Sequence, residues 1–111
     1  MKIAIIIHSN DPETAWNAFR FANTSLTFDN HVDIFLLGKG VEVASLNTLQ
    51  FDVLEQLQIF RDNGGQIMGC GVCCESRKVE MPFLLEDLKC DIGSMQNLYG
   101  LVAEADKVLT F

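Results

Sequence analysis

The sequence predicts an α/β fold: a single-domain, three-layer α/β/α sandwich built on a mostly parallel sheet of about five strands. A chain of 111 residues can bury one hydrophobic core but not two independent ones. Its short apolar runs alternate with longer segments in which apolar residues recur every three or four positions. Strands that alternate with helices are typical of parallel sheets joined by right-handed crossovers. We therefore expect residues 1–111 to form one domain.

The first strand, helix and strand are predicted near the start of the chain. The β-branched run from Lys2 to His8 has the continuous apolar character of a strand buried on both faces. Asn-Asp-Pro at 10–12 supplies a cap and a first-turn proline, so a helix is expected from there to about Thr27. The apolar run from His31 to Leu37 is the second strand, and Gly38-Lys39-Gly40 is a turn.

The middle of the chain repeats this alternation. A short helical piece is expected around Val41 to Leu46, and a longer helix from Leu49 to Asn63, ended by Gly64-Gly65 as a left-handed C-cap. Gln66 to Gly69 is then a third strand. It delivers Cys70 at its carboxyl end, and Gly71 to Arg77 begins a helical turn.

The last third of the chain is expected to complete the sheet. Pro82 can start a short helix through Leu88, followed by a fourth strand from Lys89 to Ile92. A helix is expected from Ser94, and a final strand from Lys107 to Phe111. The apolar residues of that helix have helical spacing: Met95, Leu98, Tyr99 and Val102.

Composition excludes several classes of partner. The formal net charge is −7 and the sequence contains no run of lysine or arginine, so direct binding to nucleic acid or to an anionic membrane surface is not expected. The apolar run from Ile3 to Ile7 is too short to span a membrane, and no targeting segment is visible. We expect a cytoplasmic protein.

The main candidate site is the cysteine cluster in the segment GCGVCCESR, residues 69–77. Cys70 is predicted to leave a strand and enter a helix, so the free N–H groups of the first helical turn point at its sulfur and favour the thiolate. Cys70 is therefore the predicted catalytic residue, with a lowered pKa.

The other cysteines leave alternatives open. Cys73 and Cys74 lie three and four residues after Cys70, so either could attack a sulfur held on Cys70 and resolve it as a disulfide. The same thiols, with Cys90, could also bind zinc, although a second Cys-x-x-Cys pair is missing and no metal or cofactor is the first expectation. Buried cysteines in a non-catalytic assembly subunit are the third alternative.

Three further residues are candidates for supporting roles. Gly71 leaves the backbone uncovered beside Cys70. Arg77 adds positive charge if the turn folds back, although along a regular helix it would lie ~10 Å away. His8 ends the first strand, and the carboxyl ends of parallel strands meet at one edge, so we expect it near Cys70, as an acid or base or as a structural hydrogen-bonding residue.

The segment from Cys70 to Val79 resembles the sulfur-carrier site of the DsrE/DsrF-like family of sulfur-relay proteins, which includes TusD. In that site a cysteine is followed seven residues later by arginine, as Cys70 is by Arg77. The resemblance spans nearly the whole chain and includes Met1–Ile7, Ala18–Ala22 and Ala103–Phe111. Lys78 stands where members often have glycine.

The resemblance implies a sulfurtransferase-type carrier rather than a stand-alone enzyme. Such a protein accepts a sulfane sulfur as a persulfide on Cys70 and relays it to an acceptor thiol. Its implied partners are persulfide donor and acceptor proteins and further copies of the chain, in a trimer or hexamer. A metal-binding or thiol-redox module and a non-catalytic oligomeric subunit remain the alternatives.

Overall fold

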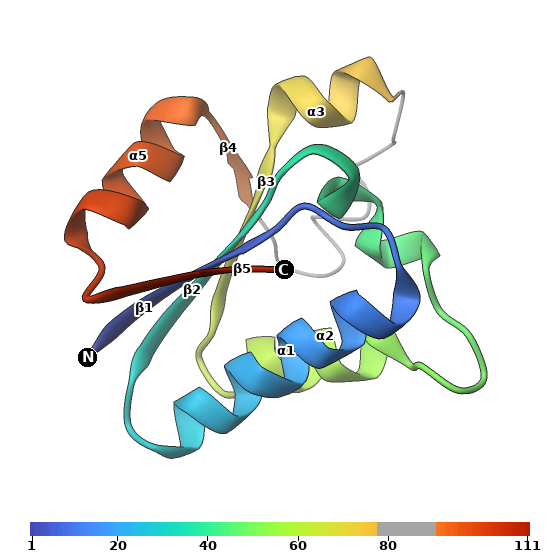
Figure 1. Cartoon of the computed structure of the whole chain (residues 1–111), viewed down its shortest axis with the longest axis horizontal. Coiled ribbons are helices and arrows are strands. Elements are labelled where there is room, and N and C mark those ends of the chain that lie inside the picture. The colour runs from blue at the N-terminus through green and yellow to red at the C-terminus, as the bar shows by residue number, and fades with distance from the viewer. Residues whose placement is uncertain (78–90) are drawn as a thin grey trace.

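A five-stranded sheet forms the centre of the protein (Figure 1). The computed structural model describes residues 1–77 and 91–111, and within them the strand order is β4-β3-β2-β1-β5, with every pairing parallel. This all-parallel sheet confirms the predicted α/β class. The strands are β1 (Lys2–Ile7), β2 (His31–Leu36), β3 (Gln66–Cys70), β4 (Asp91–Gly93) and β5 (Lys107–Thr110).

Helices cover the two faces of the sheet unequally. Helices α1 and α2 pack against each other on one side, while α5 lies on the other (Figure 1). The short helix α3 follows β3 directly and contacts η1, a 3₁₀ helix that follows β2. The helices are α1 (Pro12–Thr27), η1 (Gly38–Ser45), α2 (Val53–Asp62), α3 (Gly71–Ser76) and α5 (Met95–Glu104).

Helix α1 begins where the sequence supplies a cap. The carboxylate of Asp11 accepts hydrogen bonds from the backbone N–H and the hydroxyl of Thr14, both at 2.9 Å, and these bonds lower the pKa of Asp11. The inner face of the helix is fully buried, and Phe19 packs edge-on against Phe60 of α2 with ring centroids 6.3 Å apart. Small alanines around Phe19 let α1 lie close to the sheet: Ala15, Ala18 and Ala22.

Alternate residues of each strand face opposite sides of the sheet. The set that faces α1 and α2 is almost continuously aliphatic and buried. The other set is mixed in character, and on that side Leu101 of α5 lines a small groove together with Asp33, Met68 and Asp91. The buried aliphatic set is Ile3, Ile5, Ile7, Val32, Ile34, Leu36 and Ile67.

Several predicted boundaries differ from the structure. Helix α2 begins at Val53 rather than Leu49, because the side chain of Asp52 accepts the N–H of Glu55 at 3.1 Å and caps the helix there. The helical piece after β2 starts at Gly38, earlier than predicted, and is a 3₁₀ helix. Strand β4 is Asp91–Gly93 and ends one residue later than predicted, while Lys89 and Cys90, at the start of the predicted strand, lie outside the described residues.

The helix predicted from Pro82 to Leu88 lies outside the described residues. Among the helices that the structure does describe, none combines the length and apolar character needed to cross a membrane.

Candidate functional site

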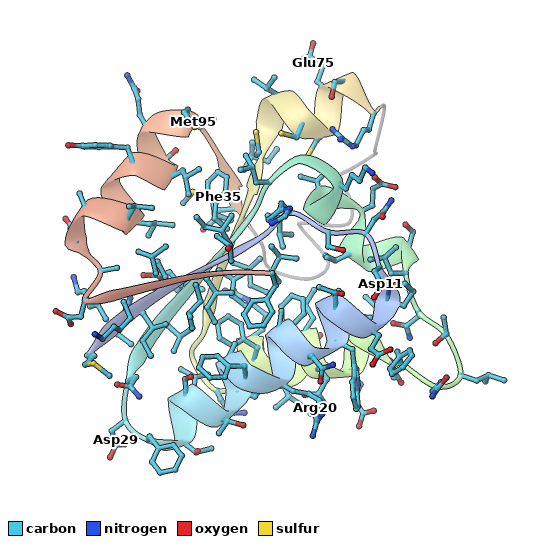
Figure 2. All side chains as sticks on the ribbon, viewed as in Figure 1. Asp11, Arg20, Asp29, Phe35, Glu75 and Met95 are labelled. Atoms are coloured by element: carbon cyan, nitrogen blue, oxygen red, sulfur yellow. The ribbon has the colours of Figure 1, made fainter. Side chains whose placement is uncertain are left out.

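Cys70 lies where β3 ends and α3 begins, as predicted. It is the last residue of the strand and the N-cap of the helix, and its Sγ accepts the backbone N–H of Cys73 at 3.4 Å. Only 4% of Cys70 is exposed. Figure 2 shows sulfur atoms gathered along the start of α3, at the carboxyl edge of the sheet. Open parallel sheets commonly bind their ligands at this edge.

The predicted lowering of the Cys70 pKa is wrong. Burial raises the pKa of this thiol above its ordinary value, and the hydrogen-bonding interaction with the Cys73 side chain raises it further. The backbone N–H groups of Cys73 and Val72 act in the predicted direction and lower the pKa, but burial outweighs them. Burial of Cys70 therefore favours the protonated thiol over the thiolate.

Cys73 and Cys74 have different surroundings although they are adjacent. The Sγ of Cys73 is partly exposed and accepts the backbone N–H of Gly38 at 3.2 Å. Gly38 has a φ of 55°, a left-handed conformation that favours glycine, at the start of η1. Cys74 instead belongs to the hydrophobic core, and burial raises its pKa to about 11. Cys73 thus lies at the site and Cys74 beneath it.

Arg77 turns back towards the site, but it binds the backbone rather than the sulfur of Cys70. Its guanidinium donates to the carbonyl oxygen of Cys73 at 3.3 Å and pairs with the Glu42 carboxylate of η1 at 3.4 Å. Arg77 therefore links α3 to η1, and Glu42 neutralises part of its charge. The sequence analysis missed Glu42 and the contact of Gly38 with Cys73, although it placed the 38–40 turn at this edge of the sheet.

The structure assigns His8 and Gly71 structural contacts. His8 is exposed and its backbone N–H donates to Phe111 O at 2.9 Å; within residues 1–77 and 91–111 no hydrogen bond joins its ring to a cysteine. A Cβ built on Gly71 would lie 3.0 Å from Cγ2 of Ile92 in β4. The backbone beside Gly71 is thus covered by Ile92.

Zinc binding was the main alternative for the cluster. Among the described residues, no group of three or more histidine, cysteine or acidic side chains is arranged to hold a metal ion. Cys90 lies outside the described residues. The three described cysteines therefore do not make a metal centre by themselves.

The fold and the site together define a class of protein. It is a small parallel α/β protein with a buried thiol at the carboxyl end of β3 and a second thiol held against the backbone of the neighbouring turn. The chain belongs to the DsrE/DsrF-like family, whose model matches residues 1–111. The resemblance inferred from the cysteine segment is confirmed.

Three similar proteins have names that assign no activity. An uncharacterized protein of Methanocaldococcus jannaschii is 34% identical, and the match covers all of both chains. An uncharacterized protein of Methanopyrus kandleri is 30% identical over 89% of this chain and 83% of its own length. A conserved protein of unknown function from Bacteroides thetaiotaomicron has the same fold, with a TM-score of 0.80 and 23% identity over 99% of this chain and 94% of that chain.

Proposed function

We propose that this protein carries a sulfane sulfur as a persulfide on Cys70 and passes it to an acceptor thiol. Membership of the DsrE/DsrF-like family supports sulfur chemistry. The observation that carries the proposal is the position of Cys70 as the N-cap of α3, where its Sγ accepts a backbone N–H at 3.4 Å. An N–H donor directed at the sulfur stabilises negative charge on a thiolate or a persulfide.

Two thiol exchanges make up the proposed cycle. In loading, the Cys70 thiolate attacks the terminal sulfur of a donor persulfide, a new S–S bond forms, and the donor leaves as a thiolate. In unloading, an acceptor thiolate attacks the terminal sulfur and Cys70 leaves. No external oxidant or reductant is consumed, because the sulfane sulfur keeps its oxidation state throughout. The raised pKa of Cys70 makes loading of the isolated chain faster as the pH rises.

The test is to load the reduced protein anaerobically with cysteine persulfide and to measure its peptides by mass spectrometry after alkylation. The Cys70 peptide, alkylated immediately after loading, should gain one sulfur atom. Cys70→Ser should gain none while its circular dichroism stays unchanged, and Cys74→Ala, which alters a core cysteine in the same helix, should still load. Sulfur retained on the Cys70→Ser protein would overturn the assignment.

We further propose that copies of this chain assemble into a homo-oligomer, a trimer or hexamer, through the side of the sheet that α5 covers. Large apolar side chains are exposed there, including Met95 and Tyr99 of α5 and Val108 of β5. Covering them removes apolar surface from water. Sedimentation velocity measures the assembly.

The proposed function also places the protein in the cytoplasm, where thiols stay reduced. Its other proposed partners are persulfide donor and acceptor proteins.

A further inference from the structure

We propose that Cys73 discharges the persulfide on Cys70 by forming a Cys70–Cys73 disulfide and releasing hydrosulfide. This inference rests on the proposed function of Cys70 as the sulfur carrier. It assigns the site a second activity, persulfide reduction, when no acceptor protein is bound.

The contacts within the first turn of α3 place Cys73 against Cys70. The backbone N–H of Cys73 lies 3.4 Å from the Cys70 Sγ, and the two side chains interact as well. Cys70 is the extended N-cap of α3, and Cys73 lies three residues later in the first turn of this six-residue helix, the spacing of a Cys-x-x-Cys redox motif. A disulfide between them requires Cβ atoms about 3.5–4.5 Å apart.

The surroundings of the two neighbouring cysteines select Cys73 rather than Cys74 as the attacking thiol. The Gly38 N–H points at Sγ of Cys73 from 3.2 Å and stabilises negative charge on that sulfur. Cys73 is also partly exposed, so water reaches its side chain. Cys74 is 5% exposed within the apolar core, and burial favours its protonated form.

The step balances without an oxidant. The Cys73 thiolate attacks Sγ of Cys70, the bond between that Sγ and the terminal sulfur breaks, and the terminal sulfur leaves with the electron pair as HS⁻. The sulfane sulfur is reduced by two electrons, and forming the disulfide from the Cys73 thiol supplies them. An external dithiol reductant then returns Cys70 and Cys73 to thiols, so the net reaction is reduction of a persulfide sulfur to sulfide by a dithiol.

The leaving group decides which sulfur Cys73 attacks. Attack on the terminal sulfur would expel the Cys70 thiolate, and the raised pKa of Cys70 makes that thiolate a poor leaving group. Attack on the Cys70 Sγ expels hydrosulfide, the conjugate base of a stronger acid than an alkyl thiol, which leaves faster. The same property disfavours transfer to an external thiol, which also expels the Cys70 thiolate.

The experiment compares three proteins loaded with cysteine persulfide and then freed of excess donor: wild type, Cys73→Ser and Cys74→Ala. Sulfide release and the Cys70–Cys73 disulfide are followed over time by a colorimetric sulfide assay and by peptide mass spectrometry without reduction. Wild type and Cys74→Ala should release about one sulfide per chain while forming the disulfide. Cys73→Ser should keep the added sulfur on Cys70 and release sulfide at least about tenfold more slowly.

Three results would overturn the inference, and they are distinguishable. A persulfide that persists on wild type as long as on Cys73→Ser, with no disulfide, removes the discharge step and leaves the carrier function standing. Failure of Cys73→Ser to take up sulfur at all, with its fold intact by circular dichroism, removes the carrier function and the discharge step together. Equal loss of sulfide release in Cys74→Ala would also overturn the choice of Cys73.

Discussion

The two faces of the sheet are closed to very different degrees. On the side of α1 and α2, the strands contribute buried aliphatic residues, and the helices add Phe19 and Phe60, both fully buried. On the side of α5, the same strands contribute the buried Phe35 but also Asp33, Gln66 and Asp91, and none of these three polar residues is buried. The first face is therefore apolar throughout, whereas the second mixes polar with apolar residues.

The same contrast recurs at small scale in α3. Cys74 belongs to the core, while Cys73, one residue earlier, is partly exposed and accepts the N–H of Gly38. Adjacent residues of a helix point in different directions, so one short helix can supply both a core thiol and a site thiol. Cys70 and Cys74 are buried alike, and Cys70 differs by its place at the N-cap of α3, where its Sγ accepts the N–H of Cys73.

The largest expected loss of unfolding free energy comes from truncating a buried side chain on the side of α1 and α2. Phe60→Ala removes a fully buried ring that packs on Phe19, and should lower the free energy of unfolding by about 3–5 kcal/mol. Ile59→Ala changes the neighbouring residue of α2, which is 38% exposed, and should cost less than about 1 kcal/mol. Urea unfolding measures both, and similar losses for the two variants would contradict the closed face.

Substitution of two glycines tests how tightly side chains are packed on each side of the sheet. A Cβ on Gly65 would lie 2.4 Å from the Phe60 ring, so Gly65→Ala should cost about 1–3 kcal/mol by overpacking. A Cβ on Gly100 of α5 meets nothing within 4 Å, so Gly100→Ala should stabilise the helix by about 0.5–1 kcal/mol. Thermal and urea unfolding should give opposite signs, and a loss in both variants would mean that α5 is as tightly packed as α2.

The core position of Cys74 predicts a pH dependence. Its folded pKa of about 11 lies above the ordinary value of 9.0, so folding favours the protonated thiol. The resulting stability is complete below about pH 9 and is lost as the pH rises towards about 11, because the unfolded chain releases the proton first. We expect a loss of about 1–2 kcal/mol across this window. Cys74→Ala should reduce the fall in unfolding free energy across this window and leave the part that comes from Cys70, and an unchanged pH dependence would contradict burial of Cys74.

The smallest effect on the stability of one chain, but a large one on assembly, is expected at α5. Tyr99 is 74% exposed, so Tyr99→Glu should leave the unfolding free energy of the monomer within about 0.5 kcal/mol. If copies cover this side, the buried carboxylate should shift the oligomer to monomer in sedimentation velocity. Phe28→Glu, at an equally exposed aromatic residue after α1, is the control and should leave assembly unchanged. Equal sedimentation of all three proteins would place the interface elsewhere.

Local sequence signals predicted most of the fold. The apolar runs of β1, β2 and β3 and the cap at Asp11 were enough to place these strands and α1. The start of α2 was less accessible, because Leu49 looked like a helical apolar residue and is fully exposed, while the cap is provided by Asp52. Both the capping residue and the first apolar residue can mark the start of a helix. The spacing of apolar residues alone did not show that the cap decides where α2 begins.

The site was predictable in its position but not in its electrostatics. The strand-to-helix junction at Cys70 followed from the pattern around it, and so did the backbone N–H at its sulfur. The raised pKa of Cys70 comes mainly from burial. Burial depends on tertiary packing, which the neighbouring residues in the sequence do not reveal. The contacts from Gly38 to Cys73 and from Glu42 to Arg77 each join residues 35 positions apart, so spacing could not indicate them.

The position of β1 between β2 and β5 has a consequence for synthesis. On a ribosome, β1 and β2 are made early and can pair soon after they emerge, but the other edge of β1 pairs with β5, about a hundred residues later in the chain. Until β5 emerges, the isoleucine-rich strand from Lys2 to Ile7 has an open edge that can accept a strand from another molecule. Nascent chains of this protein therefore leave one edge of β1 unpaired until β5 has emerged.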